Sequence, residues 1–178
     1  LVKEVLRYLD PKKGENFIDG TIGQGGHSLE ILKKNGPDGM VLGMDADANQ
    51  IENAKLATHG FEKRILFVND SYITLPQAVQ KEHFLPVNGI LLDLGFSSWQ
   101  LERSNRGFTF QQNEPLDMRY NLQNTLTAEQ IVNEWSINKL EEILREYGEE
   151  KFSKKIAKAI VERRRKKQKA NWRAMRKM

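Results

Sequence analysis

The sequence predicts an α/β fold in which a doubly wound parallel sheet carries helices on both faces. Along residues 1–98, short apolar runs typical of strands alternate with segments that have helical periodicity. The apolar runs are continuous, which is typical of parallel strands buried on both faces. A group of glycines follows the first of these runs and predicts a tight turn between a strand and a helix.

The expected elements alternate between helix and strand. Helices are expected over residues 1–10, 27–36, 48–60 and 71–84, the last of them interrupted near Pro76. Strands are expected over residues 16–20, 39–47, 64–70 and 87–98, the last of them apolar through Leu92.

The pattern changes after Ser98. Residues 99–120 lack periodicity and are expected to form a loop. Further helices are expected over residues 127–135, 138–147 and 149–168. The last of these is basic, and its apolar face is expected at Phe152, Ile156, Ala159 and Ile160.

The charge of the chain is divided unevenly along its 178 residues. Residues 1–150 carry 15 Lys and Arg against 23 Asp and Glu, a net charge of −8, whereas residues 151–178 carry 13 against one, a net charge of +12. A basic end on an acidic body favours a polyanionic partner, and a solvated tail is the alternative.

The composition excludes several classes of protein. The chain has no cysteine, so disulfides and thiolate metal sites are excluded, as is typical of cytoplasmic proteins. No apolar run approaches the roughly 18 residues of a membrane span, and no signal peptide is visible. Because the first residue is Leu1 and not Met, we expect residues to be missing before it.

Each expected strand ends close to an aspartate. These aspartates are Asp19, Asp45, Asp70 and Asp93. The carboxyl ends of parallel strands meet at one edge of the sheet, where α/β proteins bind their ligands. A single aspartate at such a place often only caps a turn, but four at one edge would repel one another without a ligand or donors.

The stretch IDGTIGQGGHSLEIL, residues 18–32, has the form of a nucleotide-binding turn. Its glycines allow the backbone to approach a ligand, and the helix that follows offers N–H donors. Asp45 comes 19 residues after Gly26, a spacing at which an acid accepts hydrogen bonds from ribose hydroxyls. A turn with a structural role only is the alternative.

The kind of nucleotide follows from what the turn lacks. No phosphate-binding motif of the G-x-x-x-x-G-K-[ST] type is present, and Ser28 stands where a dinucleotide fingerprint has its third glycine. The order of acids and glycines better suits S-adenosylmethionine, which has no pyrophosphate. The sequence therefore favours a class I S-adenosylmethionine-dependent methyltransferase with a Rossmann-like sheet, and an NAD-dependent oxidoreductase is the alternative.

Several longer motifs resemble one family. The segments DGTIGQGGHS, GMDAD, LLDLGFSSWQL, RGFTF, PLDMR and YGEEKFSKKIAKAIVERR are similar, in this order, to those of the RsmH (MraW) family. The resemblance runs from residue 1 to about residue 166. It implies an S-adenosylmethionine-dependent enzyme that methylates N4 of a cytidine in small-subunit ribosomal RNA, in bacteria or in mitochondria.

The resemblance also implies a division of the chain. We expect a Rossmann-like cofactor-binding domain over residues 1–105, an inserted helical subdomain for substrate recognition over 106–168, and a basic piece over 169–178. The family has seven strands and this sequence offers four, so we expect the chain to be a fragment. A truncated RNA-binding remnant without turnover is therefore an alternative function.

The resemblance assigns the cofactor to residues around the expected sheet edge. These are Gly23, Gly25, Gly26, His27, Asp45, Tyr72, Asp93 and Gln100. His27 could instead cap its helix and Tyr72 could belong to the core, and both alternatives stay open.

Methylation of a cytosine amine needs positioning and a proton acceptor, but no metal. Many amino-methyltransferases have a proline-containing turn after the fourth strand, and here Asp93-Leu94-Gly95-Phe96 lacks the prolines. We hypothesise that Asp93, together with Ser97 and Ser98, orients the methyl donor and the target amine.

The expected partner is small-subunit ribosomal RNA or the assembling small ribosomal subunit, with no membrane, and a homodimer is left open. The expected location is the cytoplasm, or the mitochondrial matrix for the organellar branch. The residues expected to bind RNA are Arg106, Arg119, Lys154, Lys155, Lys158, Arg163 and Arg164. A structural Arg–Asp pairing is the alternative for the first two, and Trp99 could stack on a base or pack internally.

Overall fold

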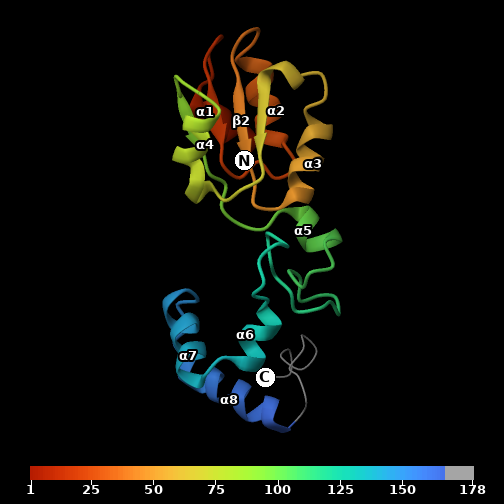
Figure 1. Cartoon of the computed structure of the whole chain (residues 1–178), viewed down its shortest axis with the longest axis vertical. Coiled ribbons are helices and arrows are strands. Elements are labelled where there is room, and N and C mark those ends of the chain that lie inside the picture. Colours follow the sequence, from red (N-terminus) through yellow and green to blue (C-terminus); the bar gives the residue numbers. More distant parts are fainter. Residues whose placement is uncertain (167–178) are drawn as a thin grey trace. The chain divides into compact units, whose positions relative to one another are not determined.

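The computed structural model describes residues 1–166 of the chain in two compact units (Figure 1). The first unit is Leu1–Ser97 and the second begins at Ser98, a few residues before the boundary expected after residue 105. The basic piece expected over 169–178 lies outside the described residues.

The first unit is built on a parallel sheet of four strands. The strands are β1 (Phe17–Asp19), β2 (Val41–Met44), β3 (Ile65–Val68) and β4 (Gly89–Leu91). Their order is β3-β2-β1-β4, and Phe17 pairs with Val41 on one side and Gly89 on the other. The predicted α/β class is confirmed, and the strand order reverses between β1 and β4, where such sheets bind ligands.

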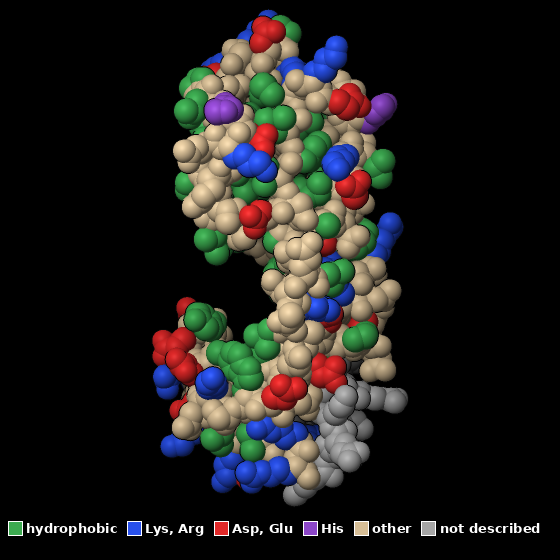
Figure 2. All heavy atoms as spheres, viewed as in Figure 1, with side chains coloured by type: hydrophobic (Ala, Val, Ile, Leu, Met, Phe, Trp, Pro, Cys, Tyr) green, Lys and Arg blue, Asp and Glu red, His purple; other side chains and the backbone are tan. Residues whose placement is uncertain are grey.

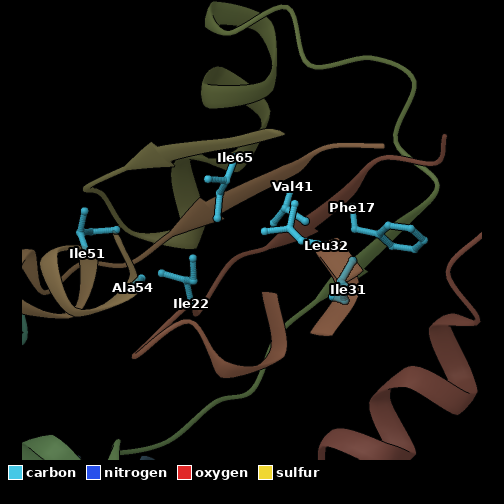
Figure 3. Packing of buried hydrophobic residues seen from close by; sticks show 8 residues of the cluster. All are labelled: Phe17, Ile22, Ile31, Leu32, Val41, Ile51, Ala54 and Ile65. Carbon is cyan, nitrogen blue, oxygen red and sulfur yellow. The ribbon is translucent and has the colours of Figure 1, made fainter. Parts of the chain in front are cut away.

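Helices cover both faces of this sheet. They are α1 (Val2–Leu9), α2 (Gly26–Lys34), α3 (Ala48–Ala57) and α4 (Leu75–Lys81), with short 3₁₀ turns at Glu62–Arg64 and Tyr72–Thr74. Phe17 and Val41 pack with the buried residues of α2 and α3 on one face (Figure 3). Ile18 and Leu42 pack with Ala78 of α4 on the other face. Neighbouring strand residues point to opposite faces, which explains the continuous apolar runs.

The second unit is helical where it has regular structure. Its helices are α5 (Ser98–Arg103), α6 (Ala128–Glu134), α7 (Ile137–Glu146) and α8 (Ser153–Lys166). The expectation of a loop over 99–120 is wrong for residues 99–103, because they belong to α5. Thr127 begins α6 with a capping box, in which its side chain and that of Gln130 exchange hydrogen bonds with the backbone.

The core of the second unit lies between α6, α7 and α8. Ala157, Ile160 and Val161 of α8 are buried there with Leu140 of α7. The expectation that Phe152 belongs to this apolar face is wrong, since 67% of the residue is exposed. Phe152 precedes the first residue of α8, so helical spacing does not determine its direction. Within residues 1–166, no helix has the length and apolar character needed to cross a membrane.

Candidate cofactor site

The glycine turn, residues 20–27, joins β1 to α2. Gly25 is the N-terminal cap of α2 and has φ +82°, a conformation that side chains disfavour. A Cβ atom placed on Gly25 would lie 3.1 Å from the Cα atom of Ala54, which is backbone and cannot turn aside. The turn therefore needs glycine here, because α3 packs directly against it.

The start of α2 offers hydrogen-bond donors to a ligand. Gly25 makes no side-chain cap, so the first-turn N–H groups of Gly26 and His27 have no partner within the helix. The Nε2 atom of His27 is also buried, with no hydrogen-bond partner in the part of the chain described. A buried polar atom left in this way costs about 1–3 kcal/mol, which a polar ligand would offset. The turn therefore fits a nucleotide-like group. Within residues 1–166, no hydrogen bond of the His27 side chain supports the alternative that it caps the helix.

Asp45 connects the end of β2 to the glycine turn. Its Oδ2 atom accepts a hydrogen bond from the Gly23 N–H at 3.0 Å, and its Oδ1 atom accepts one from the Asp47 N–H at 2.9 Å. These bonds fix the direction of the carboxylate. A carboxylate fixed at the end of the second strand, next to the glycine turn, lies where folds of this class bind ribose hydroxyls.

Asp19 lies beneath the turn and not on its surface. It is 1% exposed and accepts hydrogen bonds from the Ser28 hydroxyl at 2.8 Å and from the Thr21 N–H at 3.3 Å. Burial raises the pKa of Asp19 to about 6, and the hydrogen bond from Ser28 opposes this shift. Of the four aspartates at this edge, Asp19 therefore supports the turn, whereas Asp70 and Asp93 are exposed.

The end of β4 meets the same turn. The Asp93 N–H donates a hydrogen bond to the Thr21 hydroxyl at 2.7 Å, and the carboxylate of Asp93 is left exposed. A Cβ atom on Gly20 would lie 2.6 Å from Leu92 and 3.4 Å from the Cβ atom of Tyr72. The structure thus brings Tyr72 and Asp93 close to the glycine turn.

The loop between β4 and α5 reaches α3. The Gln50 amide donates a hydrogen bond from Nε2 to the Ser97 hydroxyl at 3.1 Å. Ser98 and Gln100 belong to α5 in the second unit, where Gln100 is buried. The sequence did not point to Thr21 or Gln50, because their partners lie 72 and 47 residues away and no local pattern marks them.

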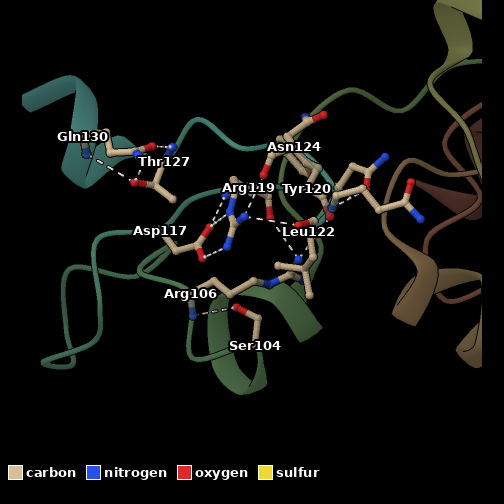
Figure 4. Close-up of polar contacts among 11 residues, drawn as sticks. Ser104, Arg106, Asp117, Arg119, Tyr120, Leu122, Asn124, Thr127 and Gln130 are labelled. Carbon is tan, nitrogen blue, oxygen red and sulfur yellow. Dashed lines mark hydrogen bonds and ion pairs between the residues drawn. The ribbon is translucent and has the colours of Figure 1, made fainter. Parts of the chain in front are cut away.

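Two arginines expected to bind RNA are held within the second unit (Figure 4). Arg106 is 6% exposed, and its guanidinium lies over the rings of Trp99 and Phe108. Its Nη1 atom donates to the carbonyl oxygens of Arg119, at 2.9 Å, and Tyr120, at 3.1 Å. This arrangement supports the structural alternative for Arg106 and internal packing for Trp99.

Arg119 forms a two-point ion pair with Asp117. The Nε and Nη2 atoms each lie 2.7 Å from a carboxylate oxygen of Asp117. These hydrogen bonds lower the pKa of Asp117 below its ordinary value. The Arg–Asp pairing left open by the sequence is therefore present, and it orders the loop before α6.

The other residues expected to bind RNA lie on α8. Figure 2 shows Lys and Arg side chains gathered over this helix. Lys154, Lys155 and Lys158 are exposed, whereas Arg163 is half-buried. Arg164 donates a hydrogen bond to the carbonyl oxygen of Val132 at 2.9 Å, so it is partly committed to the fold.

The sequence matches the MraW methylase family over residues 1–177. The chain belongs to this family. It is 41% identical over 164 residues to a protein named ribosomal RNA small subunit methyltransferase H from Dehalococcoides mccartyi, covering 92% of this chain and 47% of that protein. The proteins of the same name from Syntrophotalea carbinolica and Mycoplasma mycoides are each 42% identical, over 89% and 92% of this chain and 50% and 53% of theirs.

The chain thus spans about half the length of the curated relatives it matches. Among solved structures, it is similar to a putative rRNA-methylase from Clostridium thermocellum. The TM-score is 0.46 and the identity 23%, over 53% of this chain and 51% of that one. Membership of a methylase family favours S-adenosylmethionine over a nicotinamide cofactor as the ligand of the glycine turn.

Proposed function

We propose that the protein transfers a methyl group from S-adenosylmethionine to N4 of a cytidine in small-subunit ribosomal RNA. The observation that carries this proposal is the glycine turn with Asp45 fixed beside it, in a chain that belongs to the MraW methylase family. Relatives that share about 41% identity are named as methyltransferases of this RNA. We further propose that it acts in the cytoplasm, or in the mitochondrial matrix if it belongs to the organellar branch.

The cofactor would be held by the turn and by the ends of the neighbouring strands. The N–H groups of Gly26 and His27 would bind its amino-acid portion, and Asp45 would bind the ribose. Tyr72 and Asp93 lie close to Gly20 and Thr21 at the start of the turn. The cofactor supplies a methyl group already activated on a sulfonium, so the remaining task of the protein is to position the acceptor.

The cytosine amine is a poor nucleophile, because its lone pair is conjugated with the ring. The exposed carboxylate of Asp93 is suited to accept a hydrogen bond from this amine and to draw its lone pair out of conjugation. Thr21 fixes the backbone of Asp93, and Gln50 fixes Ser97. We propose that Asp93 and Ser97, with Ser98 next to it in the chain, hold the base so that its nitrogen faces the methyl group.

We propose that the exposed lysines of α8 bind the phosphates of the RNA. Lys154, Lys155 and Lys158 have no fixed role in the core, whereas the two arginines of the loop do. Changing these three lysines to Gln should weaken RNA binding. The slope of the logarithm of the binding constant against the logarithm of the salt concentration should become less steep, by up to about 0.7 per lysine. The matched control is Lys33 and Lys34 of α2 changed to Gln, with no expected effect on the slope.

The experiment that tests the activity follows labelled methyl transfer to small-subunit ribosomal RNA and to small ribosomal subunits. The proposal expects N4-methylcytidine after digestion to nucleosides, with less product from Asp93→Ala. Methyl transfer by Asp93→Ala at the wild-type rate would contradict the role of Asp93. Sedimentation of the same sample would decide between a monomer and the homodimer.

The second candidate is an RNA-binding protein that keeps the cofactor fold without turnover. The exposed lysines of α8, Lys154, Lys155 and Lys158, favour it, because they could bind RNA phosphates without any bound cofactor. RNA binding without any labelled product, from RNA or from subunits, would support this candidate over the enzyme.

A further inference from the structure

We propose that Gln50 is a positioning residue, which holds Ser97 and the loop after β4 against the glycine turn and thereby strengthens cofactor binding there. This inference rests on the proposed function, since it concerns the affinity of the same site.

Gln50 occupies a core position of α3. The residue is 0% exposed, whereas Asn49 beside it is exposed, and Ile51 and Ala54 share its buried face. Burying an amide without hydrogen bonds costs more than burying an apolar side chain of the same size. An apolar residue would therefore fill this position at a lower desolvation cost. Packing alone does not explain why the position holds an amide.

The amide of Gln50 connects two parts of the site. Its Nε2 atom donates to the Ser97 hydroxyl at 3.1 Å. Its Oε1 atom is buried with no hydrogen-bond partner in residues 1–166. A Cβ atom on Gly23 would lie 4.0 Å from this oxygen, so the oxygen lies beside the glycine turn. The side chain of Gln50 thus lies between the glycine turn and the loop after β4.

The loop from Asp93 to Ser97 is held at both ends by residues of the site. Thr21 binds its first residue at 2.7 Å and Gln50 binds its last. A loop that is already ordered loses less conformational entropy when a ligand binds against it. Removing the amide should therefore weaken the affinity for the cofactor, even where the fold survives.

The test uses titration calorimetry with S-adenosylhomocysteine on the whole chain. Gln50→Leu and Ser97→Ala should each weaken binding about tenfold, and the double variant should bind no more weakly than the weaker of the two. The matched control is Gln80→Leu, an exposed glutamine of α4, with unchanged affinity. Unchanged affinity of Gln50→Leu, whatever its melting temperature, would overturn the proposal, as would full additivity in the double variant.

A second measurement separates this inference from the proposed function. If the unmodified chain does not bind S-adenosylhomocysteine, the proposed function fails. Amide hydrogen exchange without ligand then tests the loop alone: residues 92–97 should exchange about tenfold faster in Gln50→Leu than in the unmodified chain. Equal exchange rates in the two proteins would show that Gln50 does not hold the loop, whatever the outcome of the titration.

Discussion

Replacing Asp19 by Asn should stabilise the protein at neutral pH and change its stability much less at acidic pH. Asp19 is buried beneath the glycine turn, where its ordinary pKa of 3.8 rises to about 6. Between these pH values the folded protein holds a proton that the unfolded chain has released. Its stability therefore falls as the pH rises through this range, and the loss is complete above the folded pKa.

The size of the effect follows from the two pKa values. A difference from 3.8 to about 6 corresponds to about 3 kcal/mol in the free energy of unfolding. Asn cannot ionise, so the variant escapes this loss. The free energy of unfolding of Asp19→Asn minus that of the unmodified protein should therefore rise by about 2.4 kcal/mol between pH 4 and pH 7.

Urea unfolding followed by far-UV circular dichroism at constant ionic strength measures this difference. Subtracting the two curves removes the titration of all groups that do not interact with Asp19, and leaves those that do, such as His27 and Asp45. Ser28→Ala is the companion variant. It removes the 2.8 Å hydrogen bond that favours the ionised form, so the fall in stability should move to higher pH. A flat difference curve for Asp19→Asn would refute the reasoning.

Three further changes test the parts of the fold that carry the sites. Gly25→Ala should lower the free energy of unfolding by about 1–2 kcal/mol from its positive φ alone and abolish S-adenosylhomocysteine binding, as thermal unfolding and calorimetry would show. Arg106→Leu should cost about 2 kcal/mol, because two carbonyl oxygens lose their donor, while the salt dependence of RNA binding keeps its slope. Thr127→Ala should cost about 1 kcal/mol in urea unfolding through loss of the α6 cap, with cofactor binding unchanged.

The features that the sequence predicted well are those marked by neighbouring residues. Continuous apolar runs that end in aspartate predicted parallel strands with acids at one edge, and the sheet confirms the strands. The glycine turn was predicted because a strand, a bare turn and a helix follow one another within a few residues. Positive φ at Gly23 and Gly25 agrees with that interpretation.

The features that the sequence did not predict depend on distant partners. Arg106 was expected at a surface, yet aromatic rings and carbonyl oxygens of its own loop bury its charge. Helix α5 has too few turns to show a clear periodicity, and it was expected to be a loop. The roles of Thr21 and Gln50 come from contacts with the loop after β4, which only the fold brings to them.

The central claim is that the glycine turn and Asp45 form a cofactor site. Its most direct test is titration calorimetry of the chain with S-adenosylhomocysteine, with Asp45→Ala beside it and Asp38→Ala, an exposed aspartate in the loop before β2, as the matched control. The account predicts binding in the micromolar range that Asp38→Ala retains and Asp45→Ala loses. A folded chain that binds no S-adenosylhomocysteine, or an Asp45→Ala variant that binds it as tightly as the unmodified chain, would contradict the account.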